Sequence, residues 1–248
     1  MIVGIVTLFT ILFFGGAQEY FFIEKLEKGV KKFVVEKDRS KEILADLKLT
    51  KSMIKDFNKA RKGKLSEFHS LNLNRTVSRE VLEEFFDERV AERKIFQKKM
   101  IERRLLFTSK IEDDEWEEII NLSDASVEKK MSKLAKKKSP DLFESVMKSV
   151  KSNIEDQDNQ SKAISIVVNF KNEYTKLLEE VNAVNSVESE LLSDKNSTAQ
   201  EFQSLADDMN QLREKAYMNL IDLHFKLKDI TNDGEWGKVM KSIYKIVR

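Results

Sequence analysis

The chain carries the same order of short segments twice, about 120 residues apart, and each series spans about 100 residues. In the first series EKLEKGVKK is followed by SKEI, FFDERVAER and DDEW; in the second, ESVMKSVKS is followed by SKAI, LADDMNQLR and DGEW. In a sequence this rich in charged residues, any single match can arise by chance. The shared order of the matches is stronger evidence for a repeat. The only two tryptophans, Trp116 and Trp236, stand at equivalent places after equivalent acidic turns. We therefore predict a tandem duplication.

Composition and apolar spacing indicate helices. Of the 248 residues, 41% are hydrophobic and 35% charged, with one proline and seven glycines. Apolar residues recur at alternating three- and four-residue steps, which places them on one helix face. Four long runs show this period: Ile43–Phe68, Leu82–Phe107, Ile164–Leu191 and Phe202–Ile230. We predict an all-α fold in which each copy is a helical-hairpin module of two long antiparallel amphipathic helices, flanked by short helices. The copies are expected to pack as a bundle or an elongated pair.

The predicted first module is residues 18–122 and the second is residues 139–248, joined by a linker at 123–138. Pro140 marks a helix start, because proline at the first helical position gives up an amide hydrogen that has no partner there. The linker is rich in lysine, and no aromatic residue lies between the lysines to stack on bases. We interpret it as a solvated connector rather than a nucleic-acid site.

Residues 1–17 precede both modules. Ile2–Phe14 is an apolar run of about 13 residues, and Gly15 and Ala17 supply small side chains where a signal peptidase requires them. The run is shorter than the about 20 apolar residues that span a bilayer. We predict a signal peptide cleaved before Gln18, and hence an extracytoplasmic protein of the periplasm or cell envelope. An N-terminal membrane anchor that is retained is the alternative.

The charge balance and the scarcity of reactive residues bear on the function. With 44 basic and 43 acidic residues, no long-range field steers nucleic acid to the chain. There is no cysteine, and neither His69 nor His224 belongs to a metal-binding motif, so each is expected at the surface or its boundary. Gly-rich phosphate loops and the GxSxG elbow are missing from the sequence. We predict no enzyme activity and no catalytic, cofactor-binding or metal-binding residues.

The candidate site residues lie at the two tryptophan turns. The acidic run at 112–118 lacks the glycine and the spacing of a calcium loop. We interpret Asp113 as a cap that accepts amide hydrogens at a helix start, with the glutamates at the positive end of the helix dipole. Each indole ring is expected to fold back over the end of the preceding hairpin. Four residues are predicted to form a structural lock or, alternatively, an interface: Trp116, Trp236, Asp113 and Asp233.

We therefore expect an exported cell-envelope protein that binds other proteins, as a non-catalytic module of the chaperone or stress-sensor kind. Its small, exported, hairpin-based design is similar to that of envelope-stress chaperones, although their LTxxQ motif is absent from the sequence. The alternative is a single-pass membrane-anchored coiled-coil scaffold or an accessory subunit of a membrane complex. Apolar helix faces of this kind pack against each other within one chain or between two chains. A homo-oligomer is therefore also compatible with the sequence.

Overall fold

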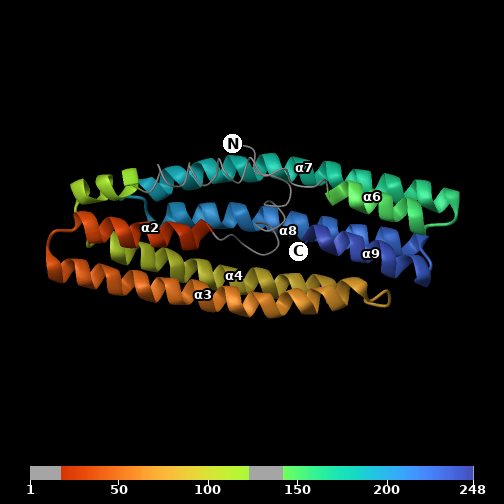
Figure 1. The fold of residues 1–248 in the computed structure, drawn as a ribbon, viewed down its shortest axis with the longest axis horizontal. Coiled ribbons are helices and arrows are strands. Elements are labelled where there is room, and N and C mark those ends of the chain that lie inside the picture. Colours follow the sequence, from red (N-terminus) through yellow and green to blue (C-terminus); the bar gives the residue numbers. More distant parts are fainter. Residues whose placement is uncertain (1–17, 123–141, 248) are drawn as a thin grey trace.

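The computed structural model describes residues 18–122 and 142–247, and over these ranges the chain forms helices and no strand. The predicted all-α fold is confirmed. All helices run along one long axis, which gives an elongated bundle (Figure 1). Besides a helix over residues 113–122, the elements are α2 (Gln18–Phe33), α3 (Lys37–Leu73), α4 (Arg79–Thr108), α6 (Leu142–Asn153), α7 (Gln157–Ser193), α8 (Ala199–Ile230) and α9 (Asp233–Val247).

Three predicted features lie outside the described residues: the leader at 1–17, the linker at 123–138 and the helix start at Pro140. Among the helices of the two described ranges, none is both long enough and apolar enough to cross a membrane. Cleavage of the leader therefore stays a prediction.

The long helices start and end at corresponding places in the two halves of the chain. Both α3 and α7 have 37 residues, and their bounds differ by about 120 positions at each end. The starts of α4 and α8 differ by the same amount. The apolar runs predicted at 164–191 and 202–230 lie within α7 and α8, and the second run ends at the observed end of α8.

Local capping explains where the long helices begin. The hydroxyls of Ser78 and Thr198 accept backbone amide hydrogens at the starts of α4 and α8. Glu201 completes a capping box, because its carboxylate accepts the Thr198 amide at 2.7 Å. The side chains of Glu36 and Asp156 likewise accept backbone amide hydrogens at the starts of α3 and α7. These contacts satisfy first-turn amides that have no partner within the helix.

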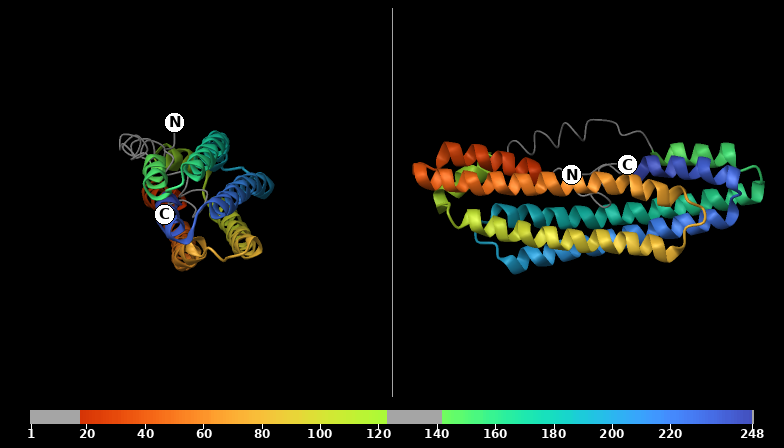
Figure 2. Two further views of the ribbon diagram at one scale, coloured as in Figure 1. Left: turned by 90° about the vertical axis from the view of Figure 1, so that its right-hand side faces the viewer. Right: turned by 90° about the horizontal axis from the view of Figure 1, so that it is seen from below.

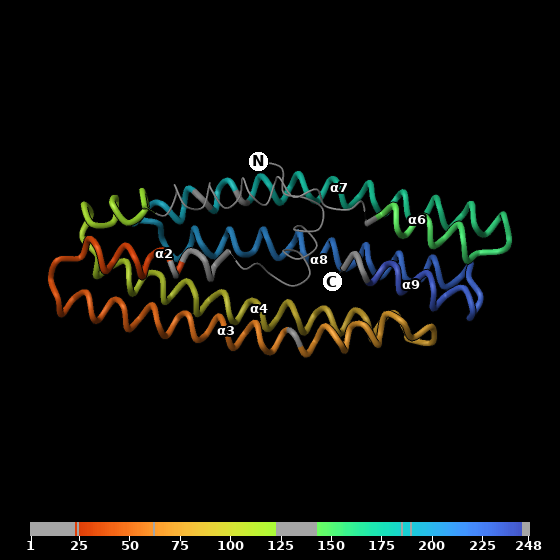
Figure 3. The backbone as a smooth tube through the Cα atoms, viewed as in Figure 1, coloured from red at the N-terminus to blue at the C-terminus, as the bar shows by residue number. Residues whose placement is uncertain are grey.

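The two hairpins meet through their second helices. α4 packs antiparallel against α8 in the body of the bundle, and α3 and α7 lie on either side, as Figure 1 and the end view in Figure 2 show. Arg79 pairs with Asp222 at 2.7 Å across this contact, and the Asn210 amide donates to Gln97 at 2.8 Å. The backbone trace shows the short helices at the two ends, with α2 along α3 and α6 beside α7 and α9 (Figure 3).

Buried apolar side chains form two clusters. The smaller cluster joins α2, the first part of α3, the end of α4 and the helix at 113–122, and it includes Leu26 and Trp116. The larger cluster joins the whole second half to the tip of the first hairpin, where Phe68 and Phe86 are buried. The Phe86 ring stacks on the ring of Tyr217 at 4.2 Å between centroids. The tip of one hairpin thus shares a core with the other half.

The helix at 113–122 approaches α2 closely at Gly29. A Cβ atom on residue 29 would lie 2.8 Å from Cγ2 of Ile119, nearer than side-chain carbons pack. Glycine is therefore the residue that allows these two helices to touch, and this contact positions the turn that carries Trp116.

Candidate functional site

The two tryptophan turns lie toward opposite ends of the bundle, and both indole rings are buried. Each turn is closed by a glutamate that reaches back along the chain. Glu115 accepts the Glu112 amide at 3.0 Å, and Glu235 accepts the Asn232 amide at 2.9 Å. The expected cap by Asp113 is not among these contacts, because its carboxylate lies beside the ammonium of Lys195.

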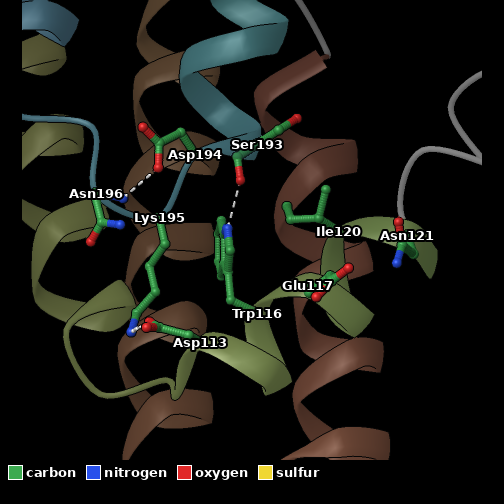
Figure 4. Close-up of a pocket in the computed structure, with 9 residues that line it drawn as sticks. All are labelled: Asp113, Trp116, Glu117, Ile120, Asn121, Ser193, Asp194, Lys195 and Asn196. Atoms are coloured by element: carbon green, nitrogen blue, oxygen red, sulfur yellow. Dashed lines mark hydrogen bonds and ion pairs between the residues drawn. The ribbon is translucent and has the colours of Figure 1, made fainter.

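Trp116 joins the first half of the chain to the second. Its indole Nε1 donates to the carbonyl oxygen of Ser193 at 2.7 Å, at the last residue of α7 (Figure 4). The ammonium of Lys195 lies 2.5 Å from Asp113 beside it. Trp116 and Asp113 thus hold the turn between α7 and α8.

Trp236 makes the reverse connection, from the second half to the first. Its Nε1 donates to the carbonyl oxygen of Leu73 at 2.8 Å, at the last residue of α3. Arg75 pairs with Asp233 at 2.7 Å beside it. We expected each ring to fold over its own hairpin, whereas each indole N–H donates to the hairpin of the other half. We call these two sets of contacts the Trp116 lock and the Trp236 lock.

Arg104 supports the Trp116 lock from α4. One guanidinium nitrogen lies 3.3, 3.1 and 3.0 Å from the carbonyl oxygens of Leu191, Leu192 and Asp194. The guanidinium carbon lies 5.0 Å from the centre of the Trp116 ring. The side chain is only 6% exposed, and burial lowers the pKa of Arg104 to about 10, although Asp194 opposes this shift. The cation stays favourable there because the C-terminus of α7 is the negative end of the helix dipole.

His224 occupies the corresponding place in the Trp236 lock. Its ring meets the Trp236 ring edge-on at 4.7 Å, and its Nδ1 lies 3.5 Å from the side-chain oxygen of Asn72. The expectation of a surface position is wrong for His224, which is 1% exposed because α3 and α9 both cover it. Burial, with a smaller effect from the charge of Lys228, lowers the pKa of His224 to about 4. His69 is half-buried, at the boundary as expected.

An open pocket of about 350 Å³ lies beside the Trp116 lock, between the helix at 113–122 and the turn after α7 (Figure 4). Among the described residues that line it, the charged side chains are three carboxylates and one ammonium, and that ammonium already pairs with Asp113. The wall therefore carries an excess of negative charge next to side-chain amides. The lining residues are Asp113, Trp116, Glu117, Ile120, Asn121, Ser193, Asp194, Lys195 and Asn196.

The acidic run at 112–118 is used in ion pairing. Arg39 of α3 lies 2.9 Å from Glu112 and 2.7 Å from Glu115. In the described ranges, no group of three or more histidine, aspartate or glutamate side chains is arranged to hold a metal ion.

The comparisons with known proteins give no further guide to the site. No protein-family model matches the sequence, and neither a curated protein nor a solved structure matches it.

Proposed function

We propose that this chain is an exported, non-catalytic protein of the cell envelope that binds other proteins, as an interaction module of the chaperone or stress-sensor kind built from two copies of one helical-hairpin module. Three observations support the two copies: the matching bounds of α3 and α7, the matching caps of α4 and α8, and the reciprocal locks. Ser193 and Leu73, which accept the two indole N–H groups, differ by the same displacement of about 120 residues. In this proposal both tryptophans have a structural role, because each indole hydrogen bond joins one module to the other.

We place the partner site at the pocket beside the Trp116 lock. The observation that carries this assignment is the charge of the described lining residues, because Glu117 and Asp194 line the pocket and the lysine among them, Lys195, pairs with Asp113. Arg104 opposes the charge of Asp194 from below the pocket, so Glu117 is the carboxylate on which the assignment depends. Side-chain amides of Asn121 and Asn196 complete the wall and offer both donors and acceptors. A basic side chain presented by a protein partner fits such a wall, with the amides hydrogen-bonding to the partner's backbone.

A photocrosslinker placed at the pocket will test this site. The chain has no cysteine, so Asn196→Cys gives a single labelling position at the rim, and Thr76→Cys gives the matched position in the turn after α3. In native cell-envelope extract, we expect the label at residue 196 to form a protein adduct at least about fivefold more strongly than the label at 76. Glu117→Lys should reduce this adduct about tenfold, because it reverses one charge of the wall.

Two outcomes would contradict the proposed site. Equal adducts from both labels would show that the pocket has no special role. An adduct that survives Glu117→Lys and about 0.5 M salt would show that the negative charge of the wall does not recruit the partner.

The envelope location rests on the leader and is tested separately. We expect N-terminal sequencing of the protein from its native cells to begin at Gln18, since Gly15 and Ala17 fit the cleavage site. A chain that begins at Met1 and sediments with membranes would instead support the alternative, a membrane-anchored coiled-coil scaffold. In that case the proposed partner site still holds, because it does not depend on the leader. The side of the membrane on which the helical body lies would then follow from the charges that flank the anchor.

A further inference from the structure

The outward face of α4 carries a row of exposed apolar side chains. Val81, Ile95 and Leu106 are 43%, 60% and 42% exposed. At 100° per residue, they lie within about 40° of one another around the helix, so they form a single stripe about 38 Å long. α4 packs on α3 and α8, and its remaining side is open at the surface of the bundle (Figure 2).

The corresponding positions of α8 are all charged. They are Glu201, Lys215 and Lys226, each of which lies about 120 residues after its counterpart in α4. At these three positions α8 carries charged residues where α4 carries exposed apolar ones, which alternate along α4 with exposed charged residues such as Glu88 and Lys99. The contrast marks the face of α4 as a contact surface.

Charge divides α4 into two opposite halves. Residues 79–92 contain six acidic and two basic residues, whereas residues 93–106 contain six basic residues and one acidic residue. A parallel copy of α4 would place like charges side by side. An antiparallel copy places each acidic half against a basic half, as an isologous two-fold contact does.

The apolar stripe has the same two-fold character. If two α4 helices cross antiparallel with the axis between residues 93 and 94, Val81 of one copy lies opposite Leu106 of the other. Ile95 then lies within one turn of its own counterpart, next to the axis. Glu88 of each copy faces Lys99 of the other, and both side chains are on the exposed surface.

We propose that the protein forms a symmetric dimer in which the outward faces of two α4 helices pack antiparallel. The occupant of this face is a second copy of the chain, because α4 is complementary to itself in both apolar pattern and charge. One helix pair is a small contact, so we expect a dissociation constant on the order of micromolar. The dimer does not depend on the proposed pocket, which lies at the end of the bundle.

Sedimentation velocity of the full chain across a concentration series tests the dimer. We expect Ile95→Lys, which introduces the residue type found at position 215 of α8, to weaken association at least tenfold. Met218→Lys changes an exposed apolar residue of α8 and should leave association unchanged. Circular dichroism of each variant will verify that the helices are intact.

Charge reversal gives the decisive experiment. Glu88→Lys and Lys99→Glu should each weaken self-association, because each places like charges opposite one another twice in the dimer. An equimolar mixture of the two variants should associate like the wild type, since every pair then joins lysine to glutamate. A wild-type chain that stays monomeric to millimolar concentration would overturn the proposal. So would a dimer that Ile95→Lys leaves intact, or a mixture that does not recover.

Discussion

Replacing Trp236 with alanine will lower the free energy of unfolding by about 4 kcal/mol. The ring is 3% exposed, lies within the larger core cluster and contacts His224, so its removal leaves a cavity that the packed helices cannot fill. The change also leaves the carbonyl of Leu73 without its indole donor. Urea unfolding followed by circular dichroism measures the loss.

Phenylalanine separates the hydrogen bond from the bulk of the ring. Trp236→Phe keeps most of the packing and removes the N–H group, so we expect a loss of about 1–2 kcal/mol. Trp116→Phe is the matched control at the other lock and should cost less, because Ser193 lines an open pocket where water can replace the donor. If both phenylalanine variants unfold like the wild type, the indole hydrogen bonds do not stabilise the contact between the halves.

The helices could be predicted because their signals are local. Apolar residues at helical spacing define the face of α8 from Phe202 to Ile230, and Thr198 with Glu201 forms a capping box that needs no distant partner. Gly63 lies inside α3, and the helix continues through it to Leu73. Packing along α3 and α4 offsets the roughly 1 kcal/mol that a glycine costs in a helix.

The reciprocal locks could not be predicted in the same way. Each indole donates to a backbone carbonyl, which every residue possesses, so the sequence does not distinguish Ser193 or Leu73 from their neighbours. The charge pairs beside them left a weak signal: a basic residue lies two positions after the end of α3 and of α7, and an aspartate precedes each tryptophan by three. Opposite charges at those places, Lys195 with Asp113 and Arg75 with Asp233, are consistent with the cross-connection.

The burial of His224 did leave a signal in the sequence. Tyr217, Ile221 and His224 follow one another at steps of four and three residues, beside the stripe that begins at Phe202. A helix with two adjacent apolar stripes is covered on two sides, and α8 is in fact covered by both α4 and α7. A histidine within the second stripe is therefore a core residue.

This buried histidine makes the stability of the protein depend on pH. In the folded chain the pKa of His224 is lowered to about 4, first by burial and then by Lys228, whereas a histidine in the unfolded chain titrates near 6.5. Between these values the unfolded state binds a proton that the folded state does not. Stability therefore falls as the pH falls through this window, and the loss is absent above it, where the ring is neutral in both states.

We expect His224 to contribute a loss of about 2 kcal/mol in the free energy of unfolding between pH 7 and pH 5, rising to about 3 kcal/mol near pH 4. Carboxylates add their own titration at the acid end, so the comparison is made with His224→Asn, which keeps a polar side chain beside Asn72 and cannot take up a proton. Urea unfolding of both proteins across this pH range measures the difference.

Lys228→Met distinguishes the two causes of the shift. Removing the lysine charge should raise the pKa of His224 and so reduce the loss between pH 7 and pH 5, but only in part, because burial is the larger cause. A wild-type protein and a His224→Asn variant that lose the same free energy over this interval would show that the ring is hydrated in solution. The Trp236 lock would then be open to water at the place where α3, α8 and α9 meet.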